Sequence, residues 1–143
     1  MNLRKLIQSI LDKTLLKDGV LSHHLKRVLP DKIDATTSKK INNDEYVVFR
    51  FYSPRRRIYG DGKPKIAQHL IDVNYYYSYD KSDARFDGAE KRVNAVLSEF
   101  LSDTRFLLAV SPHDVTDVSN DYRGINFQLS FIGTVDYVKE NTT

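Results

Sequence analysis

Apolar residues recur at intervals of three and four in two parts of the chain, which predicts two amphipathic helices. The first helix is expected over about residues 2–17, and it ends where Gly19 follows Asp18, because glycine commonly follows a last helical turn. The second helix is expected over about residues 83–102. Its apolar stripe consists of Phe86, Ala89, Val93, Val96, Leu97 and Phe100.

Elsewhere the apolar period changes to two, which is typical of strands that bury one face. This alternation predicts strands over residues 45–53, 66–79 and 125–137, and the apolar run at residues 105–111 predicts a buried strand. The positions expected to face the core in the two longest strands are Ala67, His69, Ile71, Val73, Tyr75, Tyr77 and Tyr79, then Ile125, Phe127, Leu129, Phe131, Val135 and Tyr137. The polar positions expected to face outward include Asp72, Asn74, Asn126, Gln128 and Ser130.

Together these elements predict a single α+β domain over residues 1–143, in the order α-β-β-α-β-β. About four strands would form one antiparallel sheet with a long hairpin, and both main helices would pack on its apolar face. Residues 20–29 are interpreted as a short second helix or turn that ends at Pro30. Residues 31–44 are interpreted as a polar linker, and residues 112–123 as a polar loop.

Composition narrows the function classes only slightly. The formal charge is +3 and the pI is near 9.0. Positive and negative residues are mostly interspersed, so the net charge does not indicate a particular kind of partner. The chain contains no cysteine, which excludes disulfides, thiolate metal sites and a cysteine nucleophile. It also contains no apolar run of about 20 residues and no signal-peptide pattern. We therefore expect a soluble intracellular protein that does not enter a membrane.

The histidines do not form a recognisable metal site. His23 and His24 are adjacent, and His69 and Asp72 are an odd number of residues apart on a predicted strand, which places them on opposite faces. His113 lies near Asp114 and Asp117, but their spacing matches no known ligand pattern. We interpret these groups as ordinary polar side chains and expect no metal and no cofactor.

Two short motifs have alternative enzymatic interpretations. The segment Gly60-Asp61-Gly62-Lys63 precedes a strand, whereas a phosphate-binding loop must open a helix, so turn chemistry explains its glycines better. Pro30-Asp31 and Asp61-Gly62-Lys63 resemble the motif of restriction-type nucleases, in which carboxylates hold Mg²⁺. Here Asp61 is expected at a loop tip and Asp31 before the sheet, so they are poorly placed to converge. We expect no catalytic residue and no enzyme.

The surface offers two candidate interaction features. Residues 54–65 form the one concentrated basic segment and are expected to be an arm at the tip of the hairpin. The arm residues expected to contact a partner are Arg55, Arg56, Arg57, Ile58, Tyr59, Lys63 and Lys65. The second feature is the outward face of the sheet, where Tyr52 and Tyr76 are expected to form an additional interface with Tyr46, Val48 and other apolar residues.

The order and lengths of these pieces resemble the tail-terminator and tail-completion family of long-tailed bacteriophages. Proteins of that family have an N-terminal helix, a linker, a strand, a long arm, a second strand, an amphipathic helix and a final hairpin. The matching pieces of this sequence are Tyr46-Val47-Val48-Phe49, Tyr59-Gly60-Asp61-Gly62, Ile71-Asp72-Val73-Asn74-Tyr75-Tyr76, the helix at residues 89–101 and the strand at residues 124–131. The resemblance covers nearly the whole chain, although the linker at residues 31–44 is longer than the family pattern.

The resemblance implies a structural virion protein that is assembled in the host cytoplasm and located in the tail or neck. Six copies would form a ring that caps the tail tube and then meets the head connector, with DNA only passing through its channel. The monomer would be soluble before assembly, and its arm would become ordered as the ring forms. The alternatives are a neck or head-completion protein of the same virion, a nucleic-acid-binding protein and a Mg²⁺-dependent nuclease.

Overall fold

The computed structural model describes residues 2–24, 45–52, 56–60, 63–78, 83–115 and 122–134, without the side chains of residues 56–60, 63–65, 83–86, 122 and 134. The elements are α1 (Leu3–Leu15), the short 3-10 helix η1 (Leu16–Asp18), β1 (Leu21–His24), β2 (Glu45–Phe51), β3 (Arg56–Gly60), β4 (Lys63–Ser78), α2 (Asp83–Leu101), β5 (Phe106–Val115) and β6 (Tyr122–Thr134). The expected α+β class is confirmed. No helix in these ranges is long and apolar enough to cross a membrane.

The two predicted helices are present at nearly the predicted positions. At the start of α1, the Asn2 side chain caps the helix by accepting a hydrogen bond from the backbone nitrogen of Lys5 at 2.9 Å. Gly19 ends η1 with φ 74°, a left-handed conformation that glycine adopts without a Cβ clash. The expected stop after Asp18 is therefore confirmed, and α2 likewise spans most of the predicted second helix.

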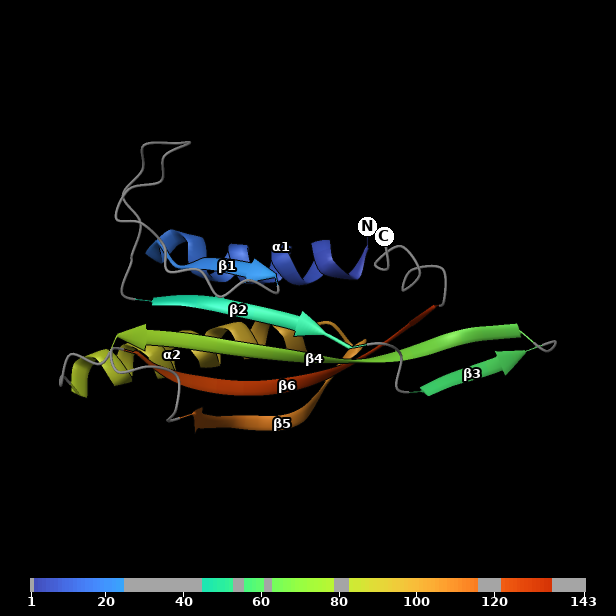
Figure 1. Ribbon diagram of the computed structural model, residues 1–143. Coiled ribbons are helices and arrows are strands. Elements are labelled where there is room, and N and C mark those ends of the chain that lie inside the picture. The colour runs from blue at the N-terminus through green and yellow to red at the C-terminus, as the bar shows by residue number, and fades with distance from the viewer. Residues whose placement is uncertain are drawn as a thin grey trace.

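The sheet is larger than the four strands predicted from the sequence. Five strands lie side by side in the order β1-β2-β4-β6-β5 (Figure 1). The sixth strand, β3, pairs with the beginning of β4. The pairs β2–β4, β4–β6 and β5–β6 are antiparallel, as expected. The predicted order α-β-β-α-β-β is wrong, because β1 precedes the first predicted strand and β3 forms within the arm.

Strand β1 replaces the short helix or turn expected at residues 20–29. It pairs in parallel with β2, with Leu21 opposite Tyr46 and His24 opposite Phe49. Four residues are too few to show a hydrophobic period, and the partner strand begins only after residue 44, so local sequence carried no signal of the pairing. The remaining residues 25–30 and the predicted linker at 31–44 lie outside the described residues.

The core lies between one face of the sheet and the two helices. It is one continuous cluster that joins the apolar stripe of α1, the later turns of α2 and the inward faces of β2, β4 and β6. The predicted inward positions of β4 and β6 are confirmed where the structure describes them, and Tyr79, Val135 and Tyr137 lie outside its description. On β1, the His24 ring packs 5.1 Å from Phe49 and 5.2 Å from Phe51, and burial, followed by the charge of Arg4, lowers the pKa of His24.

Strand β5 differs most from the prediction. It was expected to be buried over residues 105–111, yet Phe106 is its only buried residue, and the strand continues to Val115. In the described part of the chain β5 has one neighbour, β6, so it forms an edge of the sheet (Figure 1). The expected polar loop at residues 112–123 therefore contains strand residues at both ends, and residues 116–121 lie outside the description.

Candidate interaction surface

The predicted arm takes the form of a two-stranded hairpin. Strand β3 runs antiparallel to the beginning of β4, with Ile58 opposite Ile66 and Gly60 opposite Lys63. The hairpin projects past the end of β2 and beyond both helices (Figure 1). An isolated two-stranded hairpin is only marginally stable in water, so the stability of this one depends on how its base is attached to the main sheet. There Ile66 and the two residues after it also pair with β6, which fixes the base of the arm to the main sheet.

The hairpin accounts for most of the predicted arm residues. The backbone of β3 carries Arg56, Arg57, Ile58 and Tyr59, and β4 begins with Lys63 and contains Lys65. Arg55 and the side chains of these residues lie outside the described part of the structure. Because Gly60 and Lys63 pair across two antiparallel strands, the glycine segment joins strand to strand. This segment therefore does not open a helix, as a phosphate-binding loop must, while Asp61 and Gly62 themselves lie outside the described residues.

Next to the hairpin, the outward face of the sheet exposes a band of apolar side chains. The ladders place these residues on one face: Gln68 is opposite Ile132, Leu107 is opposite Ser130, and the backbone nitrogen of Tyr52 donates to Leu70. We call this set the outer apolar band, and it consists of Tyr52 directly after β2, Ile66 on β4, Ile132 on β6, and Leu107 and Val110 on β5. Each is between 36% and 53% exposed. They include five of the eight exposed large apolar side chains in the described residues, which indicates an interaction surface.

The two tyrosines proposed as a sheet-face interface lie in different surroundings. Tyr52 is 45% exposed and belongs to the outer apolar band. Tyr76 lies at the other end of the sheet, where its ring is 5.0 Å from that of Tyr46. Tyr46 and Val48, which were expected to be exposed on the outward face, are buried. The outward face is thus a candidate interface mainly at its hairpin end.

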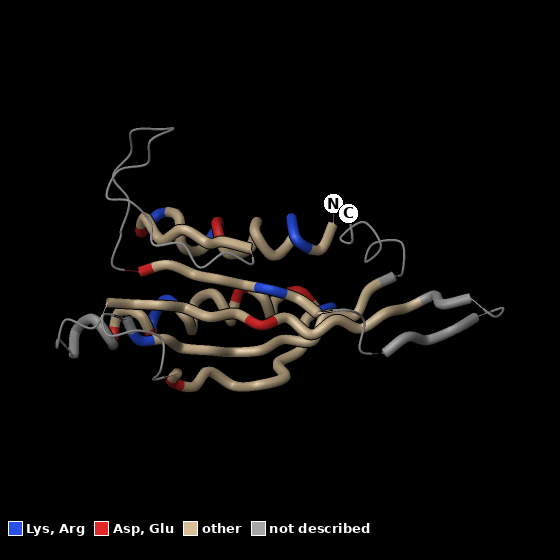
Figure 2. The backbone as a smooth tube through the Cα atoms, viewed as in Figure 1, with Lys and Arg blue, Asp and Glu red and all other residues tan. Residues whose placement is uncertain are grey.

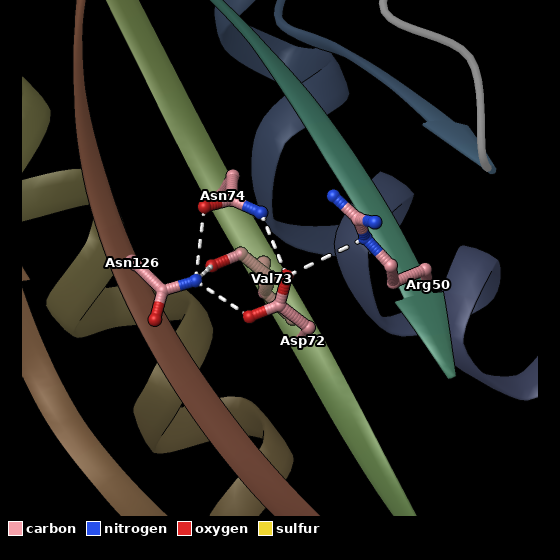
Figure 3. A network of polar contacts seen from close by, with 5 residues as sticks. All are labelled: Arg50, Asp72, Val73, Asn74 and Asn126. Atoms are coloured by element: carbon pink, nitrogen blue, oxygen red, sulfur yellow. Dashed lines mark hydrogen bonds and ion pairs between the residues drawn. The ribbon is translucent and has the colours of Figure 1, made fainter. Parts of the chain in front are cut away.

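Between these two ends, the same face carries a buried polar network that the sequence did not predict (Figure 3). The carboxylate of Asp72 accepts hydrogen bonds from Asn126 at 2.6 Å and from Asn74 at 3.0 Å, and it lies 3.6 Å from the Arg50 guanidinium. Asn126 also donates to the Asn74 side-chain oxygen at 2.9 Å. These residues were expected outward and exposed; they do lie on the outward face, but Asp72, Asn74 and Asn126 are each at most 8% exposed.

The network links the three central strands of the sheet. Arg50 comes from β2, Asp72 and Asn74 from β4, and Asn126 from β6 (Figure 3). Aspartate and asparagine are disfavoured in strand interiors. Their occurrence in the middle of predicted strands was therefore the one feature of the sequence that could have indicated a buried polar network. Because a buried polar group must keep its partners, the network specifies which residues pair across the three strands.

We expect Asp72→Ala to lower the free energy of unfolding by about 1–3 kcal/mol, because the amide donors of Asn74 and Asn126 lose their shared acceptor while remaining buried. The measurement is urea unfolding followed by circular dichroism. Arg50→Ala is the matched control, since its side chain is half exposed and 3.6 Å from the same carboxylate, and surface pairs contribute about 0–1 kcal/mol. Equal losses in the two variants would contradict a structural role for the buried amide contacts.

A second buried polar cluster connects the core face of the sheet to the helices. The carboxylate of Glu45 is buried and accepts a hydrogen bond from the Tyr75 hydroxyl at 3.0 Å and from Arg92 of α2 at 2.5 Å. Arg92 also lies 3.5 Å from Asp18 at the end of η1. Burial, followed by the charge of Glu45, raises the pKa of Tyr75 above its ordinary value, so its hydroxyl remains a neutral donor.

This cluster borders a cleft of about 270 Å³ between α1 and α2, lined by Thr14, Lys17, Asp18, Gly88, Lys91, Arg92 and Ala95. The cationic group of Arg92 is already paired with two carboxylates there. These contacts connect helix α2 to the sheet through Glu45 and to η1 through Asp18. Nothing in them resembles a nucleophile and base in hydrogen-bond reach, so we assign the cluster to the stability of the fold.

The histidines considered as metal or acid–base groups are dispersed. The Nδ1 atom of His69 lies 2.6 Å from the backbone oxygen of Tyr52 on the core face, whereas Asp72 contacts its partners on the opposite face, as predicted. His113 is exposed on β5, with Nδ1 3.0 Å from the Ser111 oxygen. In the ranges the structure describes, no three histidine or carboxylate side chains gather as metal ligands. Asp31, Asp61 and Asp117 lie outside those ranges.

Comparison of the sequence with models of known families and with curated proteins gave no match in either case. Any functional assignment therefore depends on the residues of this chain and on their arrangement. The features that distinguish its surface are the projecting hairpin, the outer apolar band beside it and the open edge at β5.

Proposed function

We propose that this protein is a structural virion component that caps a bacteriophage tail tube as a ring and joins the tail to the head connector. The observation that carries the proposal is the projecting β3–β4 hairpin rooted beside the outer apolar band. A projecting arm and an exposed apolar surface on the same subunit suit a head-to-tail contact between copies, in which one surface of each copy meets a different surface of the next. Such contacts close into a ring when the rotation between copies allows it.

The arrangement of elements supports the same proposal. Helix α1, strand β2, the arm, strand β4, helix α2 and the β5–β6 pair follow one another in the order that the family resemblance implies, with β1 as an addition. The partners we propose are further copies of this chain, six to a ring, the tail tube protein and the head–tail connector. DNA would only pass through the channel, and the proposed role requires no cofactor, metal or catalytic residue.

Charge is consistent with a protein partner for the arm. Among the residues coloured by charge, the backbone tube shows acidic and basic positions spread over both helices and several strands (Figure 2). A dedicated nucleic-acid-binding domain concentrates its basic residues along one surface. The basic residues of the arm are the exception in the sequence, and their concentration suits a local docking contact.

The experiment that tests the proposal measures solution mass by light scattering over a range of concentrations, with and without purified tail tubes. We expect either a defined ring at high concentration or binding to tube ends. The variant with Arg55, Arg56 and Arg57 all replaced by alanine should lose tail joining. A control with the same change in charge replaces the exposed Lys5, Lys17 and Lys91, which lie on α1, η1 and α2, by alanine and should join tails normally.

Each rival makes a different prediction in the same set of measurements. A neck or head-completion protein would bind purified connectors and ignore tube ends. A nucleic-acid-binding protein would bind DNA with an affinity that falls steeply with salt and is lost in the arm variant. A nuclease would cleave DNA only with Mg²⁺ and would lose that activity in Asp61→Ala. Tail joining that persists in the arm variant would overturn the role we give to the arm.

A further inference from the structure

Among the residues that the structure describes, strand β5 has an edge with no strand beside it. Its first seven residues, from Phe106 to Pro112, carry no charge. Leu107, Leu108 and Val110 are 53%, 41% and 37% exposed, and within the described residues β6 is the only strand beside them. An exposed apolar strand at a sheet edge is a template for pairing with another chain, and proteins usually guard such edges with lysine, proline or bulges.

The features of β5 that oppose pairing with a further strand begin after Leu108. The register with β6 shifts between Leu108 and Val110 and again between Val110 and His113, and Pro112 and Asp114 follow. The segment from Phe106 to Leu108 pairs regularly with β6 and has neither a charge nor a bulge. This segment therefore remains competent to accept a further strand, and its exposed leucines favour an occupant that covers them.

The hairpin strand β3 is a matching open strand on the same chain. In the described part of the structure β3 has β4 on one side and no strand on the other. Pairing would also bring no like charges together, because β3 contains Arg56 and Arg57 whereas β5 contains neither lysine nor arginine. Within one molecule they cannot meet, because β4 and β6 lie between them, which separates them by three strand spacings or roughly 14 Å.

We propose that β5 of one subunit pairs with the hairpin strand β3 of the next subunit, so that the sheet continues from one copy into its neighbour. This inference rests on the proposed ring and names the contact that closes it. The contact joins different surfaces of the two copies, which is the geometry that a ring requires. We call this pairing of β5 with β3 of the next copy the joint. Main-chain hydrogen bonds between the two strands stabilise it, and the neighbouring hairpin covers the leucines of β5.

The absence of cysteine from the chain makes a direct test practical. Ile58→Cys is combined with Leu107→Cys or with Leu108→Cys, and each protein is oxidised at high concentration and again on tail tubes. A disulfide requires Cα atoms within about 7 Å, so no link between β3 and β5 of one molecule can form. We expect at least one double variant to give a covalent ladder of subunits on a non-reducing gel, while each single variant remains monomeric.

The outcomes separate the joint from the proposed function. Rings or tube-bound protein without any cross-link in either double variant would overturn the joint and leave the ring intact. Dimers from Leu107→Cys or Leu108→Cys alone would show that β5 pairs with β5 of another copy, which also overturns it. If the protein forms no ring and ignores tube ends, the proposed function fails, and the joint fails with it.

A second pair of variants tests the same edge without cysteine. Replacing Leu107 and Leu108 together by lysine is expected to raise the concentration needed for half-assembly by roughly tenfold or more, because charge on an edge strand opposes pairing. The matched control replaces Leu16 and Leu101 by lysine, since these are 49% and 40% exposed on the helices. An equal shift in the two proteins would overturn the specific role of β5.

Discussion

Replacing Phe100 with alanine is expected to lower the free energy of unfolding by about 3–5 kcal/mol, which is the usual range for removing a fully buried phenylalanine. Phe100 is the last buried residue of α2 and has no exposed surface. Its ring lies 5.2 Å from that of Phe106 on β5 and 6.4 Å from that of Phe127 on β6. The substitution leaves a cavity where α2 meets both strands, in addition to the lost apolar burial.

The next residue provides a matched control for this prediction. Leu101 is 40% exposed at the end of the same helix, so Leu101→Ala should change the free energy of unfolding by no more than about 0.5 kcal/mol. Both variants are measured by urea unfolding, with the slope of the transition compared to the unmodified protein. A loss below about 1 kcal/mol for Phe100→Ala would show that the contact between α2 and the sheet is not as described.

Arg92→Met is expected to lower the free energy of unfolding by about 3–5 kcal/mol, because it removes the cationic partner of a buried carboxylate. Glu45 is 1% exposed, and its carboxylate accepts one hydrogen bond from Arg92 and another from Tyr75. Methionine keeps the length of the arginine stem, so lost packing contributes little. The same substitution at the neighbouring exposed Lys91 should have little effect on stability.

A double variant distinguishes an unpaired charge from a packing defect. When Glu45→Gln is added to Arg92→Met, the buried charge is removed while the Tyr75 hydroxyl keeps an oxygen to which it donates. The double variant is therefore expected to be more stable than Arg92→Met alone, with the difference measured as a coupling energy in a double-mutant cycle. If Arg92→Met and the double variant were equally destabilised, packing around Arg92 would be the dominant contribution.

The contacts of Phe100 and the Glu45–Arg92 pair both hold the sheet that carries the proposed interaction surface. Phe100 holds α2 against β5 and β6, and the Glu45–Arg92 pair holds α2 against β2. The hairpin root and the outer apolar band belong to the same sheet, so they present a defined geometry only while the helices stay in place. An interface that closes a ring depends on that geometry, because a small error in the angle between copies accumulates around the ring.

The elements that the sequence predicted well are those with a long local period. Helix α1 and helix α2 repeat their apolar residues over several turns, and β2, β4 and β6 alternate over seven or more residues. Such patterns reflect which side of an element meets the core, and they do not depend on which neighbour supplies that core. The candidate arm was identified for a similar reason, since its charges, glycines and prolines are contiguous in the sequence.

The missed features depend on residues that are distant in the sequence. Strand β1 exists because β2 lies beside it after a gap of twenty residues, and its four residues carry no readable period. The apolar run at β5 predicted burial, yet among the described residues only β6 lies beside this strand, and only Phe106 is buried. The outer apolar band joins residues on three strands with Tyr52, which directly follows β2, and it becomes visible only through the register of the sheet.

The sequence by itself determined the α+β class, the two helices and the inward faces of the long strands. It did so because hydrophobic periodicity is a property of consecutive residues. The tertiary structure alone decided that β5 is an edge, that Asp72, Asn74 and Asn126 share a buried network, and that Glu45 meets Arg92. Burial and hydrogen bonding at these residues are set by which strands and helices become neighbours, and no local pattern encodes that choice.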